Sequence, residues 1–170
     1  MGNRGCIHPG TERRITRRWT TRSWIACVLE FKGWKAPMFE AGRWTPLFFL
    51  DEATALAAGH RPCALCRRAD HKRFRAAWGE APLAEIDLTL HTERTGPRRT
   101  VRADDLTTGA MVEVDGVAHL VVDGSLRPWS SEGYGSPRSL PPTVTLLTPP
   151  SLLDVLWRGY EPLLHPTAER

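Results

Sequence analysis

Residues 48–68 read FFLDEATALAAGHRPCALCRR, and this stretch decides how the N-terminal half of the chain folds. Asp51 is a preferred N-cap residue, and Glu52 follows it in the first turn, where the helix dipole favours negative charge. The alanine-rich segment ends at Gly59, the residue type most common just after a helix. The stretch therefore predicts a short helix over residues 51–58, followed by a tight turn.

The turn carries two cysteines, Cys63 and Cys66, separated by two residues and preceded by Pro62. Two thiolates at this spacing can bind one metal ion from a tight backbone turn, the arrangement called a zinc knuckle. The chain has 4 cysteines in 170 residues. In a reducing compartment such a set indicates metal ligands before disulfides, so we expect a bound Zn²⁺ ion.

A tetrahedral zinc site needs two ligands beyond Cys63 and Cys66. We expect Cys27 as the third, because its segment predicts a strand that can pair beside the knuckle. Cys6 is the fourth predicted ligand, and His8 competes with it for that position. Two more histidines border the knuckle and are weaker candidates, His60 and His71.

The rest of the chain suggests an α+β fold with two parts. β-branched and aromatic residues, hairpin signals and helix ends guide the assignment. Strands are predicted over residues 24–31, 44–50, 86–91, 110–114, 118–122 and 144–147, with a hairpin turn at Asp115-Gly116 and a Gly, Ser and Pro-rich loop over 123–143. Further helices are predicted over residues 64–78 and from Pro150 through Trp157. Residues 79–84 predict a hinge. We therefore expect a small zinc-knuckle α/β module over residues 1–82, packed on a small, β-rich, barrel-like domain with a C-terminal helix over residues 83–170.

The formal charge of +4 is unevenly distributed. Residues 1–80 hold 15 Lys and Arg against 7 Asp and Glu, whereas residues 81–170 hold 8 against 12. A basic half favours a polyanionic partner such as nucleic acid, and a merely solvated basic surface is the alternative. Basic side chains neutralise phosphates, and aromatic faces stack on bases. The candidate contacts are Arg17, Arg18, Trp19, Arg61, Arg67, Arg68, Lys72 and Arg75.

The quoted stretch also resembles a known family. Phe48-Phe49, the capped helix with Ala58-Gly59, and Arg61-Pro62-Cys63-x-x-Cys66-Arg67 resemble the second half of the Ada-type metal-binding domain, over about residues 44–78. The resemblance implies one zinc ion bound by four cysteines in two pairs. It also implies recognition of the DNA backbone, a methyl transfer from a methylated phosphate to one cysteine, and a role in DNA repair.

Carried over position by position, the resemblance implies that Cys63 and Cys66 are ligands, and that Cys27 is both a ligand and the candidate methyl acceptor. This chain departs from the family in its first cysteine pair. The family has C-x-x-x-C there, whereas Phe31 stands at that spacing after Cys27. The resemblance therefore supplies no fourth ligand. As to the partner, it implies DNA rather than RNA.

A second function stays open. Zinc deaminases combine H-x-E with P-C-x-x-C, and this chain has His91-Thr92-Glu93 besides its cysteine pair. In such an enzyme, a zinc-dependent hydrolase such as a nucleobase deaminase or nuclease, His91 would bind the metal and Glu93 would shuttle protons as acid/base. A third possibility is a structural zinc protein whose partner is another protein.

The N-terminus has no apolar run of the signal-peptide kind, and no stretch approaches the roughly 20 apolar residues that a membrane span needs. We therefore expect a cytoplasmic protein with no membrane partner. The sequence does not predict its oligomeric state.

Overall fold

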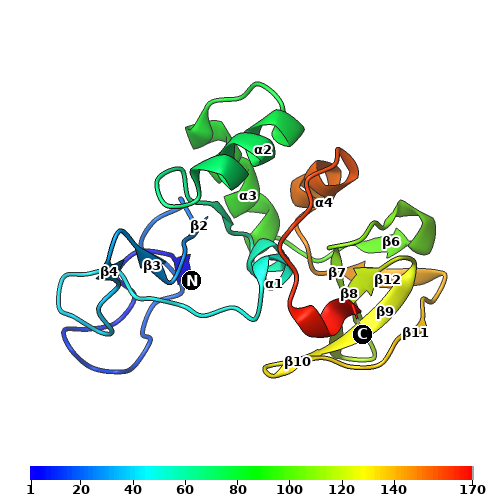
Figure 1. Cartoon of the computed structure of the whole chain (residues 1–170), viewed down its shortest axis with the longest axis horizontal. Helices are drawn as coiled ribbons and strands as arrows, with labels where there is room; N and C mark the ends of the chain where they lie inside the picture. Colours follow the sequence, from blue (N-terminus) through cyan, green and yellow to red (C-terminus); the bar gives the residue numbers. More distant parts are fainter. Residues whose placement is uncertain (170) are drawn as a thin grey trace.

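The computed structural model describes residues 1–169 and has α+β architecture (Figure 1). Its helices are α1 (Glu52–Ala57), α2 (Arg68–Trp78), α3 (Leu83–Thr95) and α4 (Pro150–Trp157), with short 3₁₀ turns η1 (Ala103–Asp105) and η2 (Pro166–Glu169). Its strands are β1 (Gly2–Asn3), β2 (Ile25–Ala26), β3 (Glu30–Phe31), β4 (Trp34–Lys35), β5 (Arg61–Pro62), β6 (Thr100–Arg102), β7 (Met111–Val114), β8 (Val117–Val122), β9 (Ser125–Ser130), β10 (Gly133–Tyr134), β11 (Arg138–Ser139) and β12 (Thr143–Leu146). None of the helices described is long and apolar enough to cross a membrane.

The C-terminal half forms a 7-stranded antiparallel sheet in the order β10-β9-β8-β7-β12-β6, with β11 also paired to β9. The sheet is open, because β10 and β6 lie at opposite ends of this order, so the predicted barrel-like closure is wrong. The C-terminal turn η2 lies beside β10 instead: the Tyr134 backbone N–H donates to the Thr167 hydroxyl at 2.8 Å. The backbone N–H of this edge strand thus has a hydrogen-bond partner without pairing to a further strand.

The predicted hairpin at Asp115-Gly116 is confirmed. It joins β7 to β8, with Val114 paired to Val117. Asp115 and Gly116 have φ angles of 52° and 76°, as a two-residue type I′ turn requires. The predicted strands near 110–114, 118–122 and 144–147 are also present, whereas the predicted loop over 123–143 contains β9, β10 and β11.

The strand predicted over residues 86–91 is wrong, since these residues lie in helix α3. The alternating letters IDLTLH suggest a strand, in which Ile86, Leu88 and Leu90 would share one face. The structure buries Ile86 and Leu90 fully but leaves Leu88 50% exposed. A separation of four residues places Ile86 and Leu90 on one face of a helix, so the helical period decides this segment.

The N-terminal half contains less regular structure than its sequence predicts. Short strands β2 and β3 replace the single strand predicted over residues 24–31, and residues 44–50 contribute one bridge between Leu47 and Gly2. Helix α1 agrees with the prediction, because the Asp51 side chain caps it by accepting from the Thr54 backbone N–H at 2.9 Å. Helix α2 begins at Arg68, four residues later than predicted, because residues 64–67 form the turn of the knuckle.

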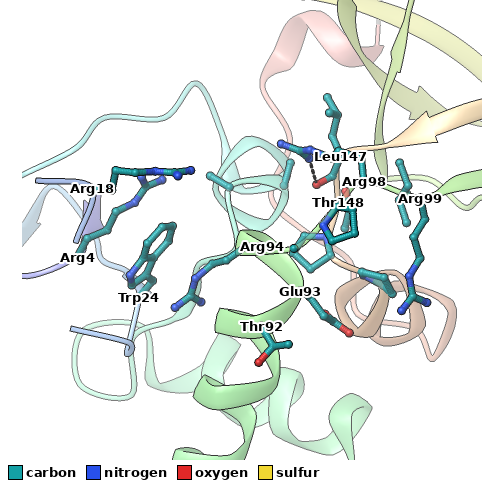
Figure 2. A pocket seen from close by; sticks show the side chains of 17 residues that line it. Arg4, Arg18, Trp24, Thr92, Glu93, Arg94, Arg98, Arg99, Leu147 and Thr148 are labelled. Carbon is teal, nitrogen blue, oxygen red and sulfur yellow. Dashed lines mark hydrogen bonds between the residues drawn. The ribbon is translucent and has the colours of Figure 1, made fainter. Parts of the chain in front are cut away.

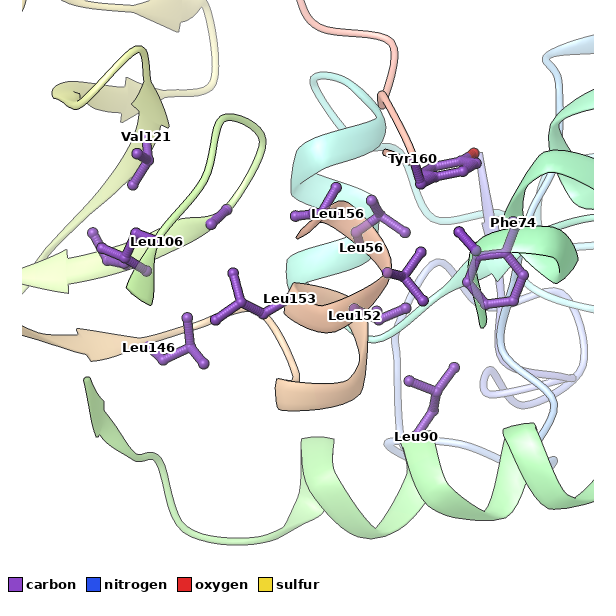
Figure 3. Close-up of a cluster of buried hydrophobic side chains, with 14 of the residues drawn as sticks. Leu56, Phe74, Leu90, Leu106, Val121, Leu146, Leu152, Leu153, Leu156 and Tyr160 are labelled. Atoms are coloured by element: carbon purple, nitrogen blue, oxygen red, sulfur yellow. The ribbon is translucent and has the colours of Figure 1, made fainter. Parts of the chain in front are cut away.

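One core joins the two halves of the chain (Figure 3). Leu56 of α1, Phe74 of α2 and Leu90 of α3 pack with Leu152 of α4 and with Val121 of the large sheet. All five side chains are at most 1% exposed. The predicted boundary near residue 82 therefore runs through a shared core, since α2 and α3 on its two sides contribute to the same cluster.

A buried ion pair ties the knuckle segment to helix α3. Arg61 and Asp87 form a bidentate pair, with Nε–Oδ1 at 2.7 Å and Nη2–Oδ2 at 2.8 Å. The Ser23 hydroxyl also donates to Asp87 and accepts from Arg61. Each charge thus has its hydrogen-bonding capacity largely filled, which a buried pair requires.

Replacing Asp87 by Ala should destabilise the protein by about 3–5 kcal/mol, because it leaves the Arg61 guanidinium buried without a countercharge. Urea denaturation of the two proteins measures this difference. The control is Asp104→Ala, which removes the exposed Arg102–Asp104 pair and should cost under about 1 kcal/mol. Equal losses in the two variants would contradict the assignment.

Candidate functional site: a cysteine triad and an arginine cleft

The pairing of β2 with β5 brings Cys27 to the knuckle. These strands are parallel, with Ile25 opposite Arg61 and Ala26 opposite Pro62. The ladder continues at its C-terminal end, where the Cys63 backbone N–H donates to the Ala26 carbonyl at 3.0 Å. Cys27 and Cys63 directly follow these two strands, so the pairing of β2 with β5 brings the two thiols side by side. Cys27 lies beside the knuckle as expected, although it directly follows strand β2 rather than lying within it.

Cys27, Cys63 and Cys66 form a triad, with their sulfur atoms all within 4.8 Å of one another. Cys63 is buried, and the other two are half-buried. Three thiols this close, on a C-x-x-C turn and an adjacent strand, form a donor set suited to a soft divalent cation. The triad can therefore hold a metal ion.

Hydrogen bonds favour the thiolate form of Cys63. A bond from the Cys27 thiol, with others from the backbone N–H groups of Cys66 and Leu65, lowers the pKa of Cys63 to about 4, against the opposing effect of burial. The same bond to Cys63, together with burial, raises the pKa of Cys27. Burial raises the pKa of Cys66, and a bond from the Val28 backbone N–H opposes that rise. N–H donors directed at sulfur suit the charge that a metal ligand carries.

Among residues 1–169, no other Cys, His, Asp or Glu places a ligand atom within 4.8 Å of all three sulfurs. The Cys6 thiol donates to the His8 carbonyl at 3.6 Å. The His8 ring lies between the Thr45 hydroxyl and the Glu40 carbonyl. Neither of the two residues that compete in sequence for the fourth position is brought to the triad.

The two bordering histidines have other partners. His60 is fully buried, and its Nε2 accepts from Arg4 Nε at 3.2 Å. Burial, with the charges of Arg4 and Arg94, lowers the pKa of His60 well below its usual value, so the ring is neutral. His71 Nδ1 lies 3.2 Å from the Pro62 carbonyl.

The structure separates the H-x-E residues from the triad. His91 Nδ1 lies 3.1 Å from Arg94 Nη2, on helix α3. The Glu93 carboxylate accepts from the Ser151 backbone N–H at 3.2 Å and from the Ser151 hydroxyl at 2.6 Å. Glu93 thereby satisfies a donor in the first turn of helix α4, where negative charge is stabilising.

The predicted phosphate contacts divide into two groups. Two of the arginines are held in ion pairs: the buried Arg61 with Asp87, and the half-buried Arg67 with Glu52 at 2.8 Å and with Asp70 at 2.7 Å. The remaining side chains are more accessible, being exposed at Arg17, Arg18, Arg68 and Lys72 and half-buried at Trp19 and Arg75. Ion pairing thus occupies two of the predicted contacts and leaves the others for a partner.

A cleft of about 460 Å³ lies where the N-terminal part meets helix α3 and the β12–α4 connection (Figure 2). Its wall is dominated by five arginines, Arg4, Arg18, Arg94, Arg98 and Arg99. Glu93 is the acidic residue of the lining, and its carboxylate is engaged with Ser151. The cleft is therefore strongly positive.

Two of these arginines contact Trp24. The Cζ atoms of Arg4 and Arg94 lie 3.9 and 4.0 Å from the centre of the Trp24 ring. Both guanidinium groups therefore stack closely on the indole. Both contacts are cation–π interactions, and Arg94 is further held by donating to the carbonyls of Gly59 and Arg22.

The charges in the cleft are not compensated by carboxylates. None of the five arginines forms an ion pair within residues 1–169. Burial, followed by the neighbouring charge of Arg18, lowers the pKa of Arg4 to about 10. Burial also lowers the pKa of Arg94 to about 10; the negative charge of Asp87 opposes this effect, and the charges of Arg4 and Arg61 add to it. Both groups remain protonated at neutral pH, so the cleft offers an anion-binding surface.

Of the predicted contacts, only Arg18 lines this cleft. Three of the cleft arginines, Arg94, Arg98 and Arg99, lie in the C-terminal half of the sequence. Because the net charge of that half is negative, the charge count indicates no polyanion site there. The adjacent pair Arg98-Arg99, directly after Gly96-Pro97, is the signal that could have directed attention there.

Comparisons of this chain with models of protein families, with curated proteins and with solved structures find no match.

Each of Cys27→Ser, Cys63→Ser and Cys66→Ser should abolish tight binding of Zn²⁺, because each removes one of three converging thiolates. Cys6→Ser is the matched control and should retain one ion per chain. Native mass spectrometry of the four variants measures the stoichiometry. Loss of the ion from Cys6→Ser would show that Cys6 is a zinc ligand, which would contradict its position in the structure.

Proposed function

We propose that the protein binds nucleic acid, DNA rather than RNA, through the phosphates of its backbone, and that Zn²⁺ at the cysteine triad stabilises the binding surface. The observation that carries the proposal is the cleft with five arginines and no ion pair. Guanidinium groups bind phosphate oxygens through two parallel N–H bonds, which makes arginine well suited to this ligand. A phosphate in the cleft would also relieve the mutual repulsion of Arg4, Arg18 and Arg94.

Trp24 supports a role in backbone rather than base recognition. An aromatic residue that stacks on a base needs an open face. Arg4 and Arg94 both stack on Trp24, and the side chain is only 5% exposed. Trp24 therefore positions charge, and binding by the cleft should depend little on base sequence.

The metal would act at a distance from the phosphates. Cys27 follows β2 and Cys63 follows β5, so an ion bound to both would hold the C-terminal end of this strand pair together. At the other end, the Arg61 backbone N–H donates to the Trp24 carbonyl at 3.1 Å. Zinc binding would thus stabilise the pairing that keeps Trp24, and the two arginines stacked on it, in place.

The resemblance to the Ada-type domain extends the proposal to sensing or processing of altered DNA, with Cys27 as the candidate methyl acceptor. Its support is the matched position of Cys27 beside Cys63 and Cys66. Mass spectrometry after incubation with DNA that carries a methylated phosphate tests it, by a gain of one methyl group on a peptide containing Cys27. No comparable observation favours the zinc hydrolase, since the Glu93 carboxylate is occupied by Ser151.

Replacing both Arg98 and Arg99 by Ala should weaken binding to duplex DNA of any sequence. Both side chains are exposed in the cleft, so folding should be little affected. If each contacts one phosphate, the slope of log affinity against log salt should become shallower by about 2. Fluorescence anisotropy over a series of salt concentrations measures both quantities.

The matched control replaces Arg43 and Arg138, which are exposed and lie outside the cleft, by Ala. It removes the same charge and should leave the salt slope nearly unchanged. Equal effects of the two double variants would mean that the cleft is not the binding surface. A parallel series with single-stranded DNA and with RNA identifies the preferred nucleic acid.

A further inference from the structure

A second pocket, of about 220 Å³, opens directly onto the cysteine triad. All three triad cysteines line it, and the rest of its wall is predominantly apolar, including Leu29, Trp34 and Leu65. No Lys, Arg, Asp, Glu or His side chain contributes to this lining, and the α-ammonium group of Met1 donates to the Cys27 carbonyl at 2.8 Å. The pocket is therefore different in character from the arginine cleft.

Large apolar side chains of this pocket are unusually exposed. Trp34, on strand β4, is 52% exposed, and Leu29 and Leu65 are 64% and 73% exposed. Leu65 lies inside the knuckle itself, between Cys63 and Cys66. Exposed apolar residues gathered at one site, unlike those scattered singly, are typical of a binding surface. Here they surround a candidate metal centre.

The triad supplies three sulfur ligands, and no other Cys, His, Asp or Glu of residues 1–169 completes it. Structural zinc sites are closed by four protein ligands, whereas sites with three protein ligands hold an exchangeable fourth ligand. A fourth ligand can approach the sulfurs through the pocket that they line. Its body would then lie against apolar side chains.

We propose that the metal centre takes a small thiol as its fourth ligand, bound as thiolate, with the apolar body of that ligand seated against Trp34 and Leu65. The inference rests on the metal site of the proposed function but not on nucleic-acid binding. A fourth thiolate suits a metal that already has three sulfur ligands. On binding, the S–H bond of the ligand breaks, a metal–sulfur bond forms and the proton passes to solvent.

The size of the pocket agrees with such a ligand. An apolar protein cavity of about 150 Å³ is large enough to bind benzene, and this pocket is larger. The apolar wall offers few partners to a strongly hydrated ligand, which would lose hydrogen bonds on entry. An aryl or alkyl thiol satisfies both constraints, because its polar atom reaches the metal and the remainder is apolar.

The test uses the full chain loaded with Co²⁺, whose visible and near-ultraviolet absorption reports the number of thiolate ligands. Thiophenol is the probe. Saturable growth of the sulfur-to-cobalt charge-transfer band is the expected result. Phenol, which has the ring without the sulfur, should produce no change. 2-Mercaptoethanol, which has the sulfur without the ring, should bind at least about tenfold more weakly, a difference of about 1.4 kcal/mol.

The pocket wall is tested separately. Trp34→Ala should weaken thiophenol binding severalfold and leave 2-mercaptoethanol binding unchanged. Trp129→Ala, which removes an exposed tryptophan of the large sheet, should change neither. Trp34 is half exposed, so its loss should not unfold the protein, and the cobalt spectrum before thiol addition verifies this.

Three outcomes would overturn the inference: no uptake of Co²⁺ by the triad, a spectrum that already indicates four thiolates, or a spectrum that thiophenol does not change. If Trp34→Ala weakened the binding of thiophenol and of 2-mercaptoethanol equally, the proposed contact between the ligand and the pocket wall would also be contradicted. Anisotropy with DNA is measured on the same samples. DNA binding without a thiol response would refute this inference alone, whereas a thiol response without DNA binding would refute the nucleic-acid proposal alone.

Discussion

The buried carboxylate of Glu52 holds together segments that are far apart in the chain. It binds Arg67 of the knuckle at 2.8 Å, accepts from the Tyr160 hydroxyl at 2.6 Å and accepts from the Leu163 backbone N–H at 3.0 Å. A buried carboxylate is costly unless its oxygens find such partners, so these segments must meet at the first turn of α1. The neighbouring residue Asp51 extends the same junction to β10 through the Tyr134 hydroxyl.

That junction fixes the knuckle, and the β2–β5 pair then relates the two candidate sites. Trp24 precedes β2 and Cys27 follows it, so one short strand has the arginine cleft at one end and the thiol triad at the other. His60 and Cys63 have the corresponding places around β5: the His60 ring lies 5.2 Å from that of Trp24, and Cys63 lies beside Cys27. A change in the pairing of these strands would disturb both sites, which gives a physical reason for a metal to influence a surface that it does not touch.

Local chemistry made part of this structure predictable. The N-cap Asp51, the hairpin at Asp115-Gly116 and the C-x-x-C turn depend on neighbouring residues, and all three are present. Cys27 was predictable because a strand beside the knuckle needed a partner. The segment IDLTLH fits both a strand and a helix, and burial of Ile86 and Leu90 without Leu88 decides between them only after the core has formed. Likewise, placing Cys6 and His8 depends on where a long irregular segment runs, which no local pattern determines.

The arginine cleft shows why counting charges along the chain could not locate the proposed binding surface. Arg61 and Arg67 stand next to the knuckle in sequence, yet the fold supplies each with a buried carboxylate, from Asp87 and Glu52 respectively. Arg94 and Arg98 belong to the acidic half, yet their nearest hydrogen-bond acceptors include the carbonyls of Gly59 and Leu147, which leave the positive charge uncompensated. The attraction of a site for phosphate depends on this remaining charge. It is determined by which basic side chains the tertiary structure pairs with acids, and therefore by contacts such as those of Glu52 and Asp87 rather than by composition.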